Sequence, residues 1–185
     1  MGNERDVFEW RRFGHWESSA AKARFAAFVL WHIAHDSRYA KLTHAAGHKS
    51  DDAGLGLFEA FRRESAVALE LVVKAVIASK LIARGADPSK EGVPATHDLP
   101  KLWSDAGLPP LEKEDKYRLQ EVKSVLTWSG RYPTPRTVKA WEEETREFAA
   151  LEDTPSASRF VIRTPTALGW IEFDRLYQVA HEAIV

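Results

Sequence analysis

Apolar residues recur at steps of three and four positions along most of this chain, which is the period of an amphipathic helix. Between about residues 18 and 39, Phe25, Phe28, Val29 and Ile33 follow this period, and alanines fill many of the other positions. A polar segment that contains glycines comes next. The pattern therefore predicts a first long helix that carries these four residues on its apolar face.

The second helical segment has the strongest pattern in the chain and ends at Gly85, which suits the left-handed backbone that closes many helices. Across from its apolar stripe lie Arg63, Glu70 and Lys74. Glu70 precedes Lys74 by four residues, the favourable order for an ion pair on a helix. We interpret these charged residues as a solvated face. The apolar stripe consists of Phe58, Phe61, Ala68, Leu69, Val72, Val76 and Ile82.

A loop and a short helix are predicted after Gly85. Residues 86–95 contain Asp, Pro and Gly, a composition typical of an exposed loop. Thr96 or Asp98 can then accept the free amide hydrogens of a new first turn, in which Pro100 is tolerated. The helix ends at Gly107, and its apolar edge consists of Leu99, Leu102, Trp103 and Ala106.

A fourth helix is predicted over about residues 112–129, with Gly130 as its stop. Pro133 keeps Tyr132 out of the helical region, and Thr134 followed by proline forms a cap and first-turn pair for another helix. The fourth helix turns Leu119, Val122, Val125 and Leu126 inward. The next helix carries Val138, Trp141, Thr145 and Phe148 on one side.

The C-terminal part contains two different segments. Residues 152–166 are rich in Ser, Thr and Pro, and the run 160–162 is either an extended stretch that crosses the bundle or disordered. A final helix is expected to dock on the core through Trp170, Phe173, Tyr177, Ala180 and Ile184.

The fold class follows from this order of elements. The sequence predicts an all-α protein, an antiparallel up-and-down helical bundle of about five or six helices. A chain of 185 residues is long enough for one well-buried domain. We expect a single helical domain over residues 1–185, with a core over about 16–150 and a C-terminal extension over 151–185.

Composition narrows the function classes. The 26 basic and 27 acidic side chains give a formal net charge of -1, so any contact with nucleic acid or an anionic membrane needs a local patch. The absence of cysteine excludes disulfides, thiolate nucleophiles and thiolate metal sites. The N-terminus lacks a signal-peptide core, and no apolar run reaches the roughly 20 residues of a membrane span. We expect a cytoplasmic protein without membrane contact and without a cofactor.

Four histidines have spacings that suit a metal site. His32 and His35 are three residues apart, and His44 and His48 are four apart, so each pair could face one way on a helix beside nearby aspartates. However, the HExxH order is absent, and histidines at a helix end are common. We therefore predict no metal site.

Three segments, taken together, resemble the HEPN superfamily, small helical bundles named for higher eukaryotes and prokaryotes nucleotide-binding. They are "LELVVKA" over residues 69–75, "HDL" over residues 97–99, and a helix that ends in "WSGRYPTP". The similarity covers about residues 58–141. It implies an α-helical up-and-down bundle, often dimeric, from toxin–antitoxin, phage-defence or RNA-processing systems.

The resemblance also bears on activity. Many members of the family are metal-independent ribonucleases whose motif is an arginine, four to six further residues, and then a histidine. Neither Arg131 nor Arg136 is followed by a histidine at that spacing, and the segment that fits, Arg38 to His44, lies earlier in the chain than the family's motif. Because the usual general acid/base is missing, a binding role gains weight over nuclease activity.

Four residues are candidates for a binding site. Arg131 and Tyr132 occupy the corner between two helices, where a guanidinium could bind a phosphate bidentately or hold the carbonyls at the helix end. His97, at a helix start, is either a cap or surface residue or a contact for the ligand. Lys74 belongs to the helical ion pair. A binding site made from these residues requires Arg131, Lys74 and His97 to converge on one groove.

Three functions remain open at this point. The first is a HEPN-like module that binds RNA, a nucleotide or a partner protein in a toxin–antitoxin or phage-defence setting, without the usual nuclease motif. The second is an active metal-independent RNase, in which a two-fold dimer pairs Arg38 and His44 to stabilise the transition state. The third is a structural or oligomerisation protein whose exposed aromatic residues form an interface. We expect a homodimer.

Overall fold

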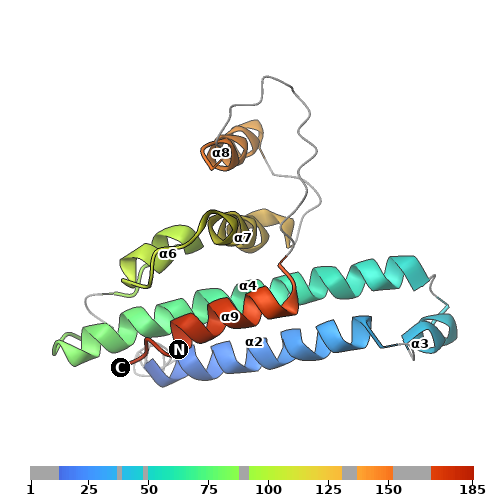
Figure 1. Cartoon of the computed structure of the whole chain (residues 1–185), viewed down its shortest axis with the longest axis horizontal. Coiled ribbons are helices and arrows are strands. Elements are labelled where there is room, and N and C mark those ends of the chain that lie inside the picture. The colour runs from blue at the N-terminus through green and yellow to red at the C-terminus, as the bar shows by residue number, and fades with distance from the viewer. Residues whose placement is uncertain (1–12, 37–38, 48–49, 88–91, 131–136, 152–167) are drawn as a thin grey trace, which may run out of the picture.

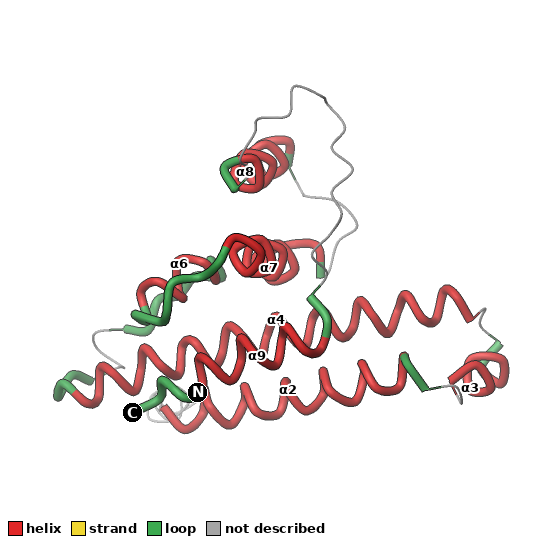
Figure 2. Tube along the Cα trace, viewed as in Figure 1, coloured by secondary structure: helices red, strands yellow, loops and turns green. Residues whose placement is uncertain are grey.

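The long helices lie side by side in one antiparallel layer. The computed structural model describes residues 13–36, 39–47, 50–87, 92–130, 137–151 and 168–185. Helices α2 (Phe13–Ala34) and α4 (Ser50–Ala83) run in opposite directions, α3 (Tyr39–Ala45) lies near the turn between them, and α9 (Trp170–His181) lies beside both (Figure 1). The described residues form helices and loops and no strand (Figure 2), which confirms the predicted all-α bundle.

A second group of helices covers the other side of α4. Helices α6 (Leu99–Asp105) and α7 (Lys113–Ser124) pack on α4, and a π-helical turn, η1 (Val125–Ser129), continues α7. Helix α8 (Val138–Ala149) lies outermost and contacts α7. Figure 1 shows α7 and α8 nearly end-on, so they run across α2 and α4. The up-and-down order therefore describes the long helices better than it describes the outer ones.

Helix α2 packs on α4 through its small residues. Ala20, Ala23 and Ala27 are buried in the core, and small side chains at a helix contact allow the two backbones to approach closely. By contrast, Phe25 is 67% exposed and Phe28 is 41% exposed. The predicted apolar face of this helix is therefore turned toward solvent, and that prediction is wrong. The helix also ends at Ala34, before the predicted position 39.

Helix α4 forms the centre of the core and confirms the predicted stripe except at Ile82, which is 49% exposed. The Phe61 ring is fully buried and lies 4.8 Å from the Trp31 ring and 6.2 Å from the Phe173 ring, centroid to centroid. After Ala83 the chain turns at Gly85, whose φ of 78° is the predicted left-handed cap. Phe173 belongs to the same buried cluster, so α9 is part of the core. This confirms the prediction that the last helix docks on the core.

The end of α7 depends on a close backbone approach. The amide of Gly130 donates to the carbonyl oxygen of Val125 at 3.1 Å, five residues back, which is the π-helical spacing. A Cβ atom at position 130 would lie 2.6 Å from the same oxygen. The φ of Gly130 is -71°, so the turn needs a residue without a side chain there and does not use the left-handed conformation.

Helix α8 begins three residues later than the predicted cap. Thr137 is its N-cap, and Thr137 Oγ1 accepts a hydrogen bond from the Ala140 amide at 3.1 Å. The predicted cap Thr134 lies outside the described residues. Of the predicted apolar side, Phe148 is buried and stacks on Tyr117, whereas Val138 is 74% exposed. The run 160–162 also lies outside the described residues.

Candidate functional site

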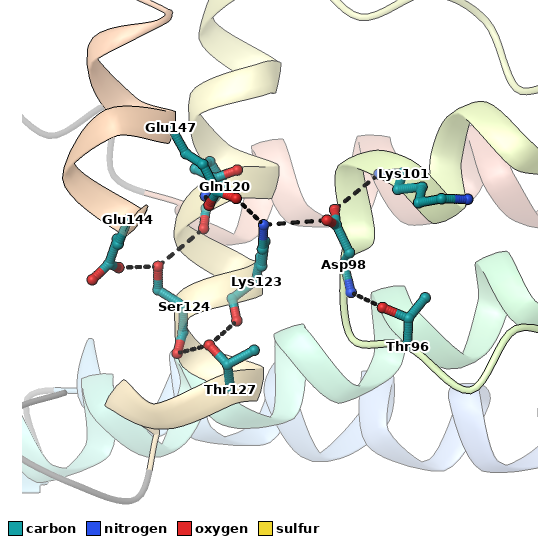
Figure 3. Close-up of polar contacts among 9 residues, drawn as sticks. All are labelled: Thr96, Asp98, Lys101, Gln120, Lys123, Ser124, Thr127, Glu144 and Glu147. Carbon is teal, nitrogen blue, oxygen red and sulfur yellow. Dashed lines mark hydrogen bonds and ion pairs between the residues drawn. The ribbon is translucent and has the colours of Figure 1, made fainter. Parts of the chain in front are cut away.

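The segment Thr96–Asp98 joins the loop after α4 to the start of α6. Thr96 Oγ1 accepts a hydrogen bond from the Asp98 amide at 3.1 Å, and Asp98 Oδ1 accepts one from the Lys101 amide at 3.1 Å (Figure 3). Asp98 is therefore the N-cap of α6, which confirms one of the two predicted caps. This turn places His97 against α4.

A buried ion pair on α4 meets His97 at this turn. Lys74 Nζ donates to Glu70 Oε1 at 2.5 Å, and both side chains are buried. His97 Nδ1 lies 3.1 Å from Oε1 and 3.0 Å from Oε2 of the same carboxylate. Lys74 Nζ also lies 5.5 Å from the centroid of the Trp16 ring on α2. The predicted ion pair is confirmed.

The predicted solvated face is wrong for Glu70 and Lys74. The sequence places them opposite the apolar stripe of α4, but Trp16 of α2 and His97 of the next segment cover them. Helix α4 has neighbours on several sides, so the side opposite its main stripe is also inside the protein. Arg63, the third residue of that predicted face, is exposed and donates to the carbonyl oxygen of Gly130 at 3.4 Å.

His97 is the accessible member of this cluster. A carboxylate only accepts hydrogen bonds, so the contact with Glu70 requires a proton on Nδ1, and in neutral imidazole Nε2 is then the acceptor. The His97 side chain is 56% exposed, whereas the charge of Lys74 is compensated by Glu70 inside the protein. The arrangement can orient a histidine toward a ligand, with Lys74 behind it.

A second polar cluster lies on the other side of the α6 cap. Lys123 Nζ donates to Asp98 Oδ2 at 3.2 Å and to Glu147 Oε1 at 2.6 Å, and Gln120 Nε2 donates to Glu147 Oε2 at 2.5 Å (Figure 3). Burial alone would lower the pKa of Lys123, but the hydrogen bonds from Lys123 to Glu147 and Asp98 raise its pKa above the usual value. A charged Lys123 therefore links α6, α7 and α8.

A third cluster joins α7 to α9. Asp115 Oδ1 accepts hydrogen bonds from Arg118 Nη1 at 2.7 Å and from Arg175 Nη2 at 2.6 Å. Burial would raise the pKa of Asp115, but the hydrogen bonds and charges of Arg175 and Arg118 hold the pKa below its usual value. Sequence reasoning missed this cluster and that of Lys123, because each is assembled from distant parts of the chain.

The structure brings together only some of the predicted binding residues. Lys74 and His97 meet through Glu70, as described above. Arg131 and Tyr132 lie outside the described residues, so their convergence with His97 stays a prediction. Arg38 lies outside the described residues as well, and His44 is an exposed residue in the last turn of α3.

His32 and His35, two of the four histidines with metal-like spacing, contact other kinds of residues. The ring of His32 lies 4.2 Å from that of Phe28, and His35 Nδ1 lies 2.7 Å from the carbonyl oxygen of Trp31. His48 is outside the described residues. Within the ranges that the structure describes, no group of three histidine or acidic side chains is placed to hold a metal ion.

Exposed apolar residues occur on both α2 and α9, and the two helices meet where Phe28 contacts Trp170. The Phe28 ring lies 5.2 Å from the Trp170 ring in an edge-to-face arrangement, and the neighbouring Ile171 is 77% exposed. We call Phe25, Phe28, Trp170 and Ile171 the α2–α9 face. Beside it, Arg24 pairs with Asp174 at 2.7 Å, and the Arg24 guanidinium lies 5.7 Å from the centroid of the Trp170 ring.

Comparison with known proteins adds no assignment. Among the described helices, none has the length and apolar character needed to cross a membrane. No family model matches the chain, and neither a curated protein nor a solved structure matches it. The resemblance to the HEPN superfamily therefore stays a prediction that the helical architecture agrees with.

Proposed function

We propose that this chain is a non-enzymatic, HEPN-like interaction module that forms a homodimer through the α2–α9 face. The observation that carries the proposal is the orientation of α2. This helix buries Ala20, Ala23 and Ala27 and leaves Phe25 67% exposed and Phe28 41% exposed, and the Phe28 ring contacts Trp170 of α9. Contiguous exposed apolar surface of this kind marks interaction sites.

A second copy of the chain suits this surface. Removing one large apolar side chain from water contributes about 1.5–3 kcal/mol of binding free energy. In a two-fold contact each residue is buried once in each copy, so this contribution is made twice. Arg24 and Asp174, beside the aromatic rings, compensate each other's charge. The formal net charge of -1 gives little repulsion between two copies. An aromatic centre with a paired, polar edge is the usual composition of such an interface.

Sedimentation velocity over a range of protein concentrations tests this proposal. We expect a reversible dimer for the wild type and a monomer for Phe25→Asp and Ile171→Asp. The matched control is Val138→Asp, which introduces the same charge at a residue 74% exposed on the outer helix α8. A wild type that stays monomeric at all concentrations contradicts the proposal, as does a control that dissociates equally.

A second candidate function is binding of RNA or a nucleotide at His97, in the toxin–antitoxin or phage-defence setting that the resemblance implies. The observation that favours it is the buried Glu70 carboxylate, which orients the half-exposed imidazole. The π-helical turn that precedes Arg131 also supports it, because such turns are frequent at functional sites. His97 would contact a phosphate, and Glu70 with Lys74 would position it.

An RNA retention and cleavage assay in EDTA tests the second candidate and the RNase alternative together. Retention that is lost in His97→Gln and Arg131→Ala, without cleavage, is the expected result for a binding module. Metal-independent cleavage that is lost in Arg38→Ala would instead favour the RNase with Arg38 and His44. Retention unaffected by His97→Gln and Arg131→Ala contradicts the binding site, and cleavage unaffected by Arg38→Ala contradicts the RNase assignment.

A further inference from the structure

The Arg118–Asp115–Arg175 cluster lines a cavity between α7 and α9. The cavity encloses about 620 Å³ and lies below the turn that joins α6 to α7. This volume is within the range of small-molecule sites. One end carries the two arginines. Its apolar wall consists of Trp103, Pro109, Pro110, Leu111, Leu176 and Val179.

The cluster has more hydrogen-bond donors than acceptors. Asp115 accepts from one nitrogen of each guanidinium, and each guanidinium carries five N–H groups. Among the described residues, Arg118 Nε is buried without a hydrogen-bond partner. Arg175 lines the cavity, and its side chain is 50% exposed. Asp115 is the carboxylate that pairs with both guanidinium groups, and the exposed carboxylates Glu112 and Glu114 line the same cavity.

A neighbouring cavity has a different arrangement of charged side chains. It encloses about 630 Å³, shares Trp103 and the α6–α7 turn, and contains Lys116, Lys123, Asp98 and Glu147. There the partly buried Lys123 is shared by two carboxylates, and Lys116 is exposed. Two guanidinium groups that share one carboxylate are therefore a feature of the arginine cavity and not of its neighbour.

We propose that the cavity at Arg118 and Arg175 binds a small organic oxyanion, that is, a carboxylate or phosphate monoester attached to an apolar group. Arg175 contacts the oxyanion through its free guanidinium edge, which suits bidentate recognition. Asp115 holds both arginines in place from behind. The apolar group packs against Leu176, Val179 and the proline turn. The exposed carboxylates Glu112 and Glu114 also line the cavity and disfavour ligands of higher negative charge.

Calorimetric titration of the full chain with four probes tests this inference. Phenyl phosphate and benzoate carry both features, inorganic phosphate lacks the apolar group, and benzyl alcohol lacks the charge. We expect phenyl phosphate or benzoate, or both, to bind about tenfold or more tightly than inorganic phosphate and benzyl alcohol. Inorganic phosphate and benzyl alcohol each lack one contact worth about that factor in affinity. Preference between phenyl phosphate and benzoate then distinguishes a phosphate ligand from a carboxylate ligand. Failure of both aromatic anions to bind overturns the proposal.

Matched variants show where the oxyanion binds. Arg175→Gln is expected to weaken binding by about tenfold or more, whereas Lys116→Gln removes the same charge from the neighbouring cavity and should leave the affinity unchanged. If Arg175→Gln does not fold, Arg175→Lys keeps the charge but not the planar fork and carries the same expectation. Equal weakening in Lys116→Gln, or wild-type affinity in a folded Arg175 variant, overturns the proposal. The inference does not depend on the homodimer.

Discussion

Helices α2 and α4 pack against each other but use their large residues in opposite ways. Helix α4 buries Phe61, Leu69 and Val72 completely, and its large side chains fill the centre of the core. Helix α2 buries Ala20 and Ala27 completely and leaves Phe25 and Phe28 exposed. The difference teaches that α4 fills the core with large side chains, whereas α2 packs on it through alanines and keeps Phe25 and Phe28 exposed, where our proposal places a second copy of the chain.

The largest expected effect separates two phenylalanines. Phe61→Ala should lower the free energy of unfolding by about 4 kcal/mol, because it leaves a cavity among three other aromatic rings. Phe25→Ala should change the stability of the monomer by less than about 0.5 kcal/mol, because its side chain is already in water. Urea unfolding at low protein concentration measures both. Equal losses in the two variants would remove the contrast between the helices.

The next effect tests the charged side of α4. Glu70→Leu should cost about 3 kcal/mol, because it leaves the Lys74 ammonium buried without a partner. Glu70→Leu combined with Lys74→Met should cost less than Glu70→Leu alone, since the uncompensated charge is then gone. Urea unfolding of Glu70→Leu, Lys74→Met and the double variant completes a double-mutant cycle. A double variant with the summed cost of the two single variants would show that the pair is not coupled.

Asp115→Asn gives a smaller, pH-dependent effect in the outer layer. At neutral pH it should cost about 2 kcal/mol, because hydrogen bonds to a charged group are lost at two arginines. The pKa of Asp115 is lowered in the folded protein, so its contribution is present above the unfolded value of 3.8 and is lost as the pH falls through the folded pKa. Thermal unfolding from neutral to acidic pH should show the two proteins converging. A difference that is constant with pH would contradict the assignment.

The smallest effect concerns the start of α8. Thr137→Ala should cost about 1 kcal/mol, because the Ala140 amide loses its acceptor. Thr137→Ser keeps the hydroxyl and is the control. Native-state hydrogen exchange of the first turn of α8 measures the change locally. Unchanged exchange in Thr137→Ala would mean that this residue does not cap the helix.

Sequence patterns predict the helices well but not their surroundings. Periodicity located α4, α7 and α9. Asp98 marked the start of α6, and Gly85 marked the end of α4. The period of α2 does not tell which side faces α4, since both the alanines and the phenylalanines recur along it. A position opposite an apolar stripe also does not tell whether another segment covers the residue, as His97 covers Glu70.

The candidate sites were predictable to different extents. The Leu-Glu-x-x-x-Lys-Ala and His-Asp-Leu patterns point to Lys74 and His97, and the structure joins them through Glu70. No local pattern links Asp115 to Arg175, because the two residues are 60 positions apart and meet only when α9 docks beside α7. Contacts of this kind follow from topology, which the spacing of residues within a helix does not encode.

The most direct test of the central claim measures how accessible the α2–α9 face is as the protein concentration rises. The chain has no cysteine, so Ala21→Cys introduces a single thiol on the exposed side of α2, four residues before Phe25. Val138→Cys, on α8, is the control. Our account predicts that thiol modification at position 21 slows with increasing concentration while the rate at position 138 stays constant. A rate at position 21 that is independent of concentration would contradict a dimer formed through this face.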